Sequence, residues 1–242
     1  MAKRTLAVIP ARYASTRLPG KPLLRETGKY LVEHAYERAA KVFDRVIVAT
    51  DDDRILQAVR SFAGEAMMTS ADHPNGTSRI AEIAKKIPCD RIVNVQGDEP
   101  EVDLKHLRLV AKLLDDAEMS TIAVPFESDA DAENPNRVKV VLDKNGFAMY
   151  FSRSRIPHNG PALLHLGLYA YTRKFLLKFV KLQAGPLERG ECLEQLRALE
   201  NGVRIRVGVV KGAARGGIDT AEDYRAFVER RAAVAVNRGG TE

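Results

Sequence analysis

Hydrophobic and polar positions alternate along the first half of the chain between short apolar runs and longer amphipathic stretches. Short apolar runs are typical of buried strands, and amphipathic stretches are typical of helices. The runs predict strands at residues 6–9, 45–49, 65–68 and 91–95, and the stretches predict helices at 29–42, 52–62, 76–86 and 103–115. Strands that alternate with helices form parallel sheets, whose ligands bind at the carboxyl ends of the strands. We therefore expect an α/β fold: a Rossmann-like, mostly parallel sheet flanked by helices.

The pattern changes after residue 121, where strands follow one another closely. Residues 138–142 and 147–151 flank Asn145-Gly146, a dipeptide that favours a hairpin turn. A strand at 165–171, helices at 174–181 and 191–200, a strand at 204–210 and a helix at 221–233 complete the prediction. We expect one domain over residues 1–242, with 121–172 as an inserted β-rich lobe.

Composition and charge narrow the class of partner. The 242-residue chain is 45% hydrophobic with a net charge of +6, and its Lys and Arg residues alternate with Asp and Glu. That favours a small anionic substrate over nucleic acid, because no basic stripe with interleaved aromatic residues is present. No apolar run approaches the roughly 18 residues of a membrane span. The two cysteines, Cys89 and Cys192, have no metal-ligand spacing, so we expect reduced thiols in a cytoplasmic, soluble protein with no membrane partner.

The connection after the first strand carries the most distinctive chemistry. It runs from Pro10 and Ala11 at the strand end to Lys21, and it contains the cations Arg12 and Arg17. Guanidinium and ammonium groups suit phosphate oxygens. The segment is neither a Walker A loop nor a Gly-x-Gly-x-x-Gly fingerprint. It therefore predicts a phosphate-handling loop of another type, with a solvated basic loop as the alternative.

Two acidic residues follow strands in positions suited to a metal ion. Asp98 comes directly after the run at 91–95, and Asp219 lies between the strand at 204–210 and the last helix. Mg²⁺ takes one or two carboxylates together with phosphate oxygens. Asp219 or Thr220 is alternatively the N-cap of that helix.

Two further polar segments have both structural and functional interpretations. Residues 71–79 form a polar loop that enters a helix, where backbone groups and small side chains could read a base edge, or where Asn75 or Thr77 could simply cap the helix. For His73 alone, the pattern favours the structural interpretation. On the strand at 165–171, His165 and Tyr169 share one face, although single His and Tyr residues are more often structural.

Nine motifs, in this order, resemble the 3-deoxy-manno-octulosonate cytidylyltransferase (CMP-Kdo synthetase) family. They are IPARYASTRLPGKPL, VATDD, DHPNGTSR, VNVQGDEP, NPNRVKVV, YFSR, HLGLYAY, LEQLRALENG and GIDTAED. The resemblance covers nearly the whole chain, from Leu6 to about Phe227. The resemblance implies that CTP and the sugar acid Kdo react to give CMP-Kdo and pyrophosphate for lipopolysaccharide assembly. It also implies a Mg²⁺ cofactor and a homodimer.

The resemblance assigns roles to matching positions. It implies that Arg12, Lys21, Asp98 and Asp219 are catalytic and that Asp98 and Asp219 bind the metal. The implied nucleotide-binding positions are Pro10, Ala11, Arg12, Ser15, Arg17, Lys21, His73, Gly76, Thr77 and Arg79. The implied sugar-binding positions are Gln96, Arg153, His165, Tyr169, Glu194 and Gln195.

One segment departs from the family pattern. Only residues 158–164 separate Pro157 from His165, where typical members carry a longer charged loop. An amino-substituted Kdo or another 2-keto sugar acid is therefore an alternative substrate. The sequence is also compatible with two different functions: a glycosyltransferase with a metal site at Asp51-Asp52-Asp53, and a non-catalytic nucleotide-binding regulator.

Overall fold

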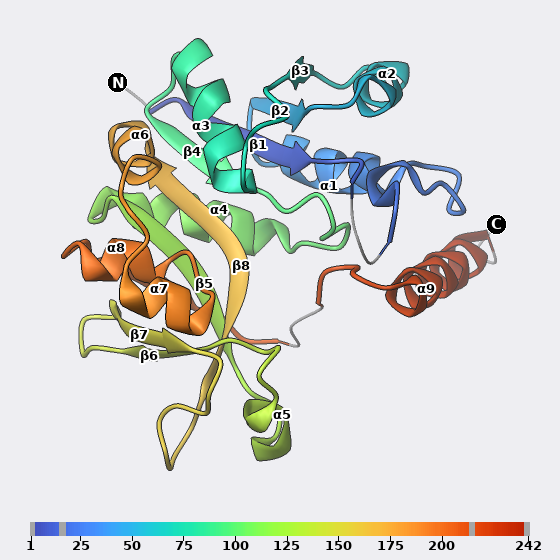
Figure 1. The fold of residues 1–242 in the computed structure, drawn as a ribbon. Coiled ribbons are helices and arrows are strands. Elements are labelled where there is room, and N and C mark those ends of the chain that lie inside the picture. Colours follow the sequence, from blue (N-terminus) through green and yellow to red (C-terminus); the bar gives the residue numbers. More distant parts are fainter. Residues whose placement is uncertain (1–2, 15–17, 213–215, 240–242) are drawn as a thin grey trace. The chain divides into compact units, whose positions relative to one another are not determined.

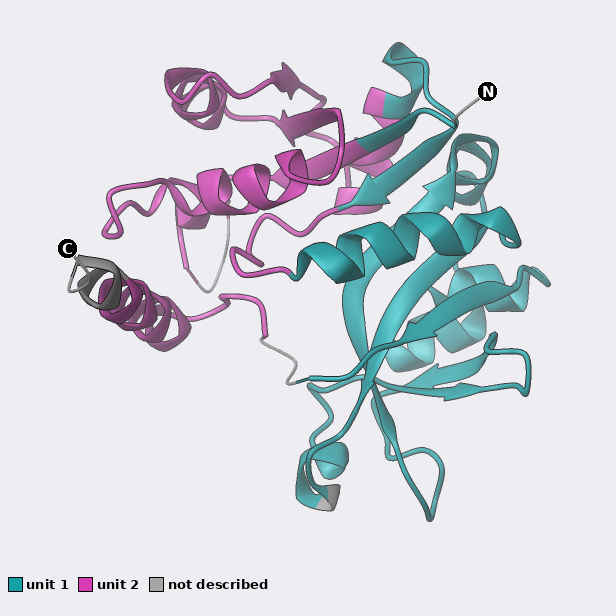
Figure 2. Ribbon diagram, turned by 180° about the vertical axis from the view of Figure 1, so that it is seen from behind, with its two compact units in different colours: residues 1–6, 84–94, 103–214 teal, residues 7–83, 95–102, 215–242 magenta. Residues whose placement is uncertain are grey.

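The chain divides into two compact units, coloured separately in Figure 2. The computed structural model describes residues 3–14, 18–212 and 216–239. Unit 1 comprises residues 1–6, 84–94 and 103–214, and unit 2 comprises residues 7–83, 95–102 and 215–242. Each unit is built from segments that are distant in sequence. Among the described residues, no helix combines the length and the apolar character needed to cross a membrane.

Unit 2 contains most of the elements predicted in the first half of the chain, with the last helix added. They are β1 (Thr5–Ala11, which begins in unit 1), η1 (Lys21–Leu23), α1 (Leu31–Ala40), β2 (Arg45–Thr50), α2 (Asp53–Ser61), β3 (Ala66–Met68), α3 (Gly76–Lys86, which ends in unit 1) and α9 (Ala221–Gly239). The strand order is β3-β2-β1. β2 and β3 are parallel, with Val48 opposite Ala66, as the alternation of strands and helices predicted.

Unit 1 contains the last strand and helix predicted in the first half and the elements of the second half other than α9. They are β4 (Arg91–Asn94), α4 (Leu104–Lys112), η2 (Leu113–Asp115), β5 (Met119–Pro125), α5 (Asp129–Glu133), β6 (Lys139–Leu142), β7 (Ala148–Ser152), β8 (Leu163–Thr172), α6 (Arg173–Phe179), α7 (Pro186–Glu191), α8 (Leu196–Glu200) and β9 (Ile205–Val209). The strand order is β4-β8-β5-β9, and the β6–β7 ribbon pairs with β8. These elements confirm an α/β fold with a sheet flanked by helices.

The long strand β8 departs from the parallel pattern. It runs antiparallel to both β4 and β5, whereas β5 and β9 are parallel. Its register against β5 shifts between Thr121 and Ile122, because Thr121 lies opposite Tyr169 while Ile122 lies opposite Leu166. A bulge of this kind re-aims side chains on the bulged strand.

The two faces of the unit 1 sheet differ in their covering. Figure 1 shows α4 behind β5 and β8, and α7 and α8 in front of them. On the α4 side, the Ser120 hydroxyl donates to Val110 O at 2.7 Å. Thr121 comes next along β5 and therefore points to the opposite face. Tyr169 of β8, one of the residues predicted to bind the sugar, lies opposite Thr121 and therefore points to that face too.

The Asn-Gly hairpin is confirmed, and one predicted helix is wrong. Gly146 has φ +76 and its N–H donates to Asp143 O at 3.0 Å, which closes the turn between β6 and β7. Of the single helix expected at 191–200, only α8 (196–200) forms as predicted, because residues 192–195 are not helical and the preceding helix, α7, lies almost entirely before this range. Cys192 adopts a left-handed conformation with φ 52, which ends α7 at Glu191. A left-handed residue is a common helix stop, although glycine usually provides it.

Helix α9 is fixed to the rest of unit 2 by a small apolar core. Tyr224 and Phe227 of α9 are buried and belong to one cluster with Leu31 of α1. The Phe227 ring packs edge-on against His34, with ring centroids 5.2 Å apart. Nε2 of His34 lies 2.7 Å from the Thr27 hydroxyl. Burial lowers the pKa of His34 to about 4, so this histidine is neutral at pH 7.

Lowering the pH should weaken the core around α9. His34 has a lower pKa in the folded protein than the ordinary 6.5, so the unfolded chain binds more protons between pH 6.5 and about 4. The free energy of unfolding should therefore fall over that range, by up to about 3 kcal/mol from this group. Urea denaturation at pH 7.0, 5.5 and 4.5 measures it.

The variant His34→Gln isolates the contribution of His34, because all other titrating groups are shared with the wild type. We expect the stability of the variant to depend less steeply on pH than that of the wild type. Parallel pH profiles for the two proteins would contradict the assignment.

Candidate active site

Three loops of unit 2 meet at the carboxyl end of β1, and two glycines allow their approach. A Cβ on Gly76 would lie 3.2 Å from Cγ of Pro10, and one on Gly97 would lie 3.2 Å from Cγ2 of Ile9. Both distances are tighter than ordinary contacts. The loop after β1, the start of α3 and the loop after β4 are therefore held close together, as expected for a ligand site at strand ends.

The loop after β1 is closed by its own backbone. Gly20 N–H donates to Tyr13 O at 3.1 Å, and Gly20 has φ +68, which leads the chain into η1. The guanidinium of Arg54 lies 3.3 Å from the Tyr13 ring centroid. Pro10 and Ala11 end β1, and Arg12 is exposed. The predicted residues Ser15 and Arg17 lie outside the described residues.

The side chain of Lys21 joins two segments that are distant in sequence. Its Nζ donates to Oδ2 of Asp98 at 2.6 Å, to the carbonyl O of Ile218 at 2.8 Å and to Oδ1 of Asp219 at 3.3 Å. The Lys21 side chain is only 14% exposed, so these contacts are partly shielded from water. The structure thus brings together Lys21, Asp98 and Asp219, three of the four residues predicted to be catalytic.

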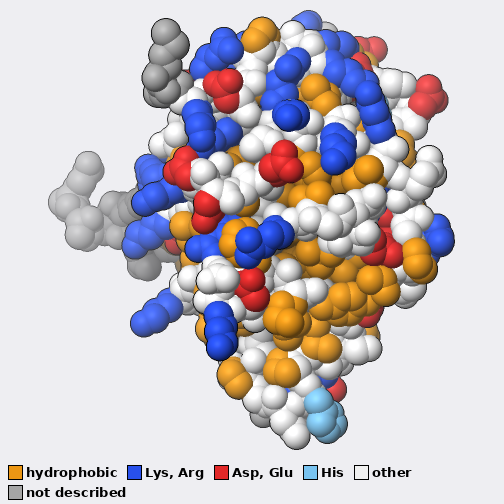
Figure 3. Space-filling model, turned by 90° about the vertical axis from the view of Figure 1, so that its left-hand side faces the viewer, with side chains coloured by type: hydrophobic (Ala, Val, Ile, Leu, Met, Phe, Trp, Pro, Cys, Tyr) orange, Lys and Arg blue, Asp and Glu red, His pale blue; other side chains and the backbone are white. Residues whose placement is uncertain are grey.

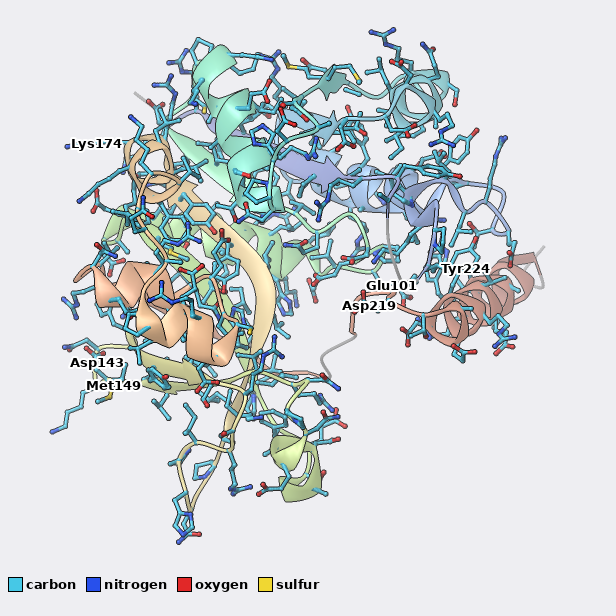
Figure 4. The ribbon with its side chains drawn as sticks, viewed as in Figure 1. Glu101, Asp143, Met149, Lys174, Asp219 and Tyr224 are labelled. Atoms are coloured by element: carbon cyan, nitrogen blue, oxygen red, sulfur yellow. The ribbon has the colours of Figure 1, made fainter. Side chains whose placement is uncertain are left out.

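Thr220, rather than Asp219, caps α9. The N–H of Asp223 donates to Oγ1 of Thr220 at 3.1 Å, and the N–H of Thr220 donates to Oδ2 of Asp223 at 2.9 Å. This reciprocal arrangement provides hydrogen-bond partners for backbone N–H groups at the start of the helix. The carboxylate of Asp219, which Figure 4 labels just before α9, contacts Lys21 instead.

The atoms around Lys21 suit a hard divalent cation. The ammonium group already lies between two carboxylates and beside a carbonyl oxygen, so a positive charge is stable there. Carboxylate and carbonyl oxygens are ligands that Mg²⁺ prefers. Burial, followed by the charge of Asp98, raises the pKa of Glu99 to about 8, so Glu99 is mostly protonated at neutral pH. Asp98 and Asp219, whose carboxylates already contact the Lys21 ammonium group, therefore fit Mg²⁺.

The polar loop before α3 is fixed by its own contacts. Oδ1 of Asn75 accepts from the N–H of Ser78 at 2.8 Å, so Asn75 caps the helix. Nε2 of His73 lies 2.6 Å from Oε2 of Glu82, and Thr77 is buried. The nucleotide roles of His73, Gly76 and Thr77 remain predictions.

The predicted nucleotide residue Arg79 is completely buried. Its guanidinium forms an ion pair with Asp51 at 2.6 Å and contacts the hydroxyl of Thr69. The neighbouring Asp52 caps α2 through a hydrogen bond from the N–H of Arg54. Asp51 and Asp52 thus have structural partners within the protein. This argues against the hypothesis that they form the Asp-x-Asp metal site of a glycosyltransferase.

In unit 1, Arg153 is held by backbone carbonyl groups. Its guanidinium donates to Glu191 O at 2.8 Å and to Pro135 O at 3.2 Å. The Glu191 carboxylate instead accepts from the N–H of Arg153 at 2.8 Å and from the Ser152 hydroxyl at 2.7 Å. These contacts orient Arg153 while the partners of its guanidinium are neutral, so its charge can act on an anionic ligand.

His165 and Tyr169 of β8 form a neutral polar group beside Thr121. The Thr121 hydroxyl lies 2.8 Å from Leu168 O and 3.0 Å from Nε2 of His165. The rings of His165 and Tyr169 are 5.2 Å apart. Burial lowers the pKa of His165 to about 3 and raises that of Tyr169 well above 10. Both side chains are therefore uncharged at pH 7 and can donate or accept hydrogen bonds.

The remaining predicted sugar residues lie in loops. Glu194 and Gln195 occupy the turn between α7 and α8 that Cys192 creates, and Gln195 is buried. Gln96 lies after β4, where its carbonyl accepts from the N–H of Glu99. Of the six, only Gln96 belongs to unit 2.

Three residues that contact the candidate sugar residues were not predicted from the sequence. They are Glu191 and Thr121, described above, and the buried Lys139, whose Nζ donates to the carbonyls of Asn134 and Arg153. Lys139 lies in the motif NPNRVKVV. A lysine within an apolar strand is unusual, and this could have marked Lys139 as a functional or structural residue. Glu191 sits beside a helix break that no spacing revealed.

The chain is a nucleotidyltransferase by family. Residues 6–205 match the family model described as cytidylyltransferase. Two relatives are each named 3-deoxy-manno-octulosonate cytidylyltransferase. The one from Syntrophotalea carbinolica is 50% identical over 236 residues, covering 90% of this chain and 94% of the relative. The one from Vibrio parahaemolyticus is 48% identical over 246 residues, covering 93% and 98%.

Solved structures agree with these relatives. A CMP:2-keto-3-deoxy-manno-octonic acid synthetase complexed with CTP superposes with a TM-score of 0.90 at 40% identity, covering 97% of this chain and 99% of that one. HddC from Yersinia pseudotuberculosis, at 17% identity and a TM-score of 0.68, shares the fold. The chain belongs to the 3-deoxy-manno-octulosonate cytidylyltransferases, as the sequence motifs predicted.

Proposed function

We propose that this protein transfers CMP from CTP to the anomeric hydroxyl of Kdo. The hydroxyl oxygen forms a bond to the α-phosphorus, the bond from that phosphorus to the pyrophosphate oxygen breaks, and the hydroxyl proton is released. The observation that carries the proposal is the cluster of Lys21, Asp98 and Asp219. The family to which the chain belongs and the CTP-bound relative support the same reaction.

The cofactor we propose is Mg²⁺, held by Asp98 and Asp219. When bound, it would neutralise phosphate charge and stabilise the charge that develops at the α-phosphorus. The protein adds positive charge through Lys21 and the exposed Arg12. Nucleotidyl transfer depends mainly on alignment and on such charge neutralisation.

The sugar acid is the second substrate, and residues of unit 1 suit its chemistry. Arg153 carries a positive charge among neutral partners, which suits a carboxylate. The uncharged His165 and Tyr169 suit hydroxyl groups. Because the loop at residues 158–164 is short, 8-amino-Kdo or another 2-keto sugar acid remains the alternative substrate.

Pyrophosphate release tests the reaction. With Mg²⁺, CTP and Kdo we expect release that depends on all three, and little release when ATP or UTP replaces CTP. Parallel reactions with 8-amino-Kdo and sialic acid test the alternative substrates. Release with one of these acids but not with Kdo would reassign the sugar, and no release with any pair would refute the enzymatic proposal.

Removing the charge of Asp98 should reduce turnover strongly. For Asp98→Asn we expect a fall of ~10²-fold or more at saturating Mg²⁺, as for the loss of one preorganised charge-stabilising group. Asp44→Asn, the same change at an exposed residue of unit 2, serves as the control. Near-normal turnover of Asp98→Asn would exclude Asp98 from the metal site.

We also propose a place for the reaction in the cell. CMP-Kdo is an activated sugar acid, so the next reaction class is transfer of the sugar to an acceptor. The family resemblance suggests lipopolysaccharide assembly, with this step in the cytoplasm where CTP is available.

The resemblance further suggests a homodimer, and exposed apolar side chains on unit 1 support it. Figure 3 shows hydrophobic side chains gathering on one face. In unit 1, Met149 of β7, labelled in Figure 4, is 63% exposed and Leu187 of α7 is 43% exposed. Exposed apolar surface of this kind often marks an interface.

Light scattering after size exclusion tests the dimer. We expect the wild type to elute at about twice the 26.8 kDa chain mass and Met149→Lys to shift toward the monomer. Met68→Lys, at an exposed methionine of unit 2, should leave the mass unchanged. A monomeric wild type at micromolar concentration would refute the proposal.

A further inference from the structure

One row of side chains crosses three neighbouring strands of unit 1. Asn94 of β4 lies opposite Tyr169 of β8, and Tyr169 in turn lies opposite Thr121 of β5. Residues directly opposite each other in antiparallel strands point to the same face of the sheet. Asn94 is therefore on the face that carries Tyr169 and the Thr121–His165 contact. Nothing in the sequence motifs assigns a role to Asn94.

Two polar atoms in this row are buried without a partner. Among the described residues, neither Oδ1 of Asn94 nor the hydroxyl of Tyr169 has a hydrogen-bond partner. The Asn94 side chain is almost fully buried, at 4% exposed. Most buried polar groups in proteins are hydrogen-bonded, and leaving one unpaired is costly. Two such groups on adjacent strands indicate a ligand that forms the missing hydrogen bonds.

Their chemistry specifies the ligand group. An amide oxygen accepts a hydrogen bond, and a protonated phenol both donates and accepts. A hydroxyl group can donate to the first and pair with the second, whereas a phosphate or carboxylate oxygen would face the amide oxygen with no hydrogen to donate. The row therefore suits a polyhydroxylated ligand better than an anionic group.

We infer that Asn94 binds a hydroxyl group of the sugar acid and, together with Tyr169, selects a polyol at this position. The inference rests on the proposed function and adds a specificity-determining residue to it. It also separates two kinds of recognition within unit 1, because Arg153 provides positive charge while the row of Asn94 and Tyr169 provides only neutral groups.

Two variants test the inference. Asn94→Ala and Asn94→Leu should each raise the KM for Kdo about tenfold to a hundredfold, the effect of one lost hydrogen bond at a buried site, and leave the KM for CTP within about twofold. Asn94→Leu replaces an unpaired polar group by an apolar one of similar size. Its Tm without ligand should therefore match or exceed that of the wild type, while the Tm increase caused by Kdo should shrink.

Ser120→Ala is the matched control, because Ser120 is also buried on this sheet but its hydroxyl donates to α4 on the other face. We expect it to lower Tm and to leave both KM values unchanged. An unchanged KM for Kdo in both Asn94 variants, with an active wild type, would overturn the inference alone. An equal rise in both KM values together with a lower Tm would show a structural role. A wild type inactive with Kdo would instead refute the proposed function.

Discussion

The site in unit 2 depends on one cation that neutralises two carboxylates from distant parts of the chain. Lys21 contacts Asp98, 77 residues away in sequence, and Asp219, 198 residues away. Two partly buried carboxylates repel each other unless a positive charge lies between them. The lysine therefore stabilises the arrangement that a divalent cation needs, and the apolar cluster of Leu31, Tyr224 and Phe227 keeps the segment before α9 in place.

Close backbone approach is the second constraint on this site. Gly76 and Gly97 lie so near Pro10 and Ile9 that a methyl group would crowd them. Loops packed this tightly leave the positions of their polar groups well defined, which catalysis by alignment requires. Two side chains in the same region, Asn75 at α3 and Thr220 at α9, accept hydrogen bonds from backbone N–H groups at the helix starts. The carboxylates of Asp98 and Asp219 are not needed as helix caps and can therefore contact a cation.

Structural features that follow from hydrophobic periodicity were predicted from the sequence. Features that follow from irregular backbone conformation were not. Alternating apolar runs located the strands and the loops at their ends, and so located Asp98 and Lys21. The left-handed Cys192 was not predictable, because no glycine marks it, and the helix break it creates positions Glu191 and Gln195. The bulge between β5 and β8 was equally hidden, since it depends on the pairing of the two strands, and it changes the register so that His165 lies opposite Ala123.

The two units carry different recognition chemistry. The candidate nucleotide residues of unit 2 include charged groups, among them Arg12 and Lys21, which suit a triphosphate. The candidate sugar residues of unit 1 include one cation, Arg153, and two side chains that burial keeps neutral, His165 and Tyr169. A polyanion is bound by charge with little regard to hydroxyl pattern, whereas a polyol is distinguished by buried groups that stay unpaired with the wrong ligand. Under the proposed function, selectivity for the sugar would therefore reside in the neutral side chains of unit 1.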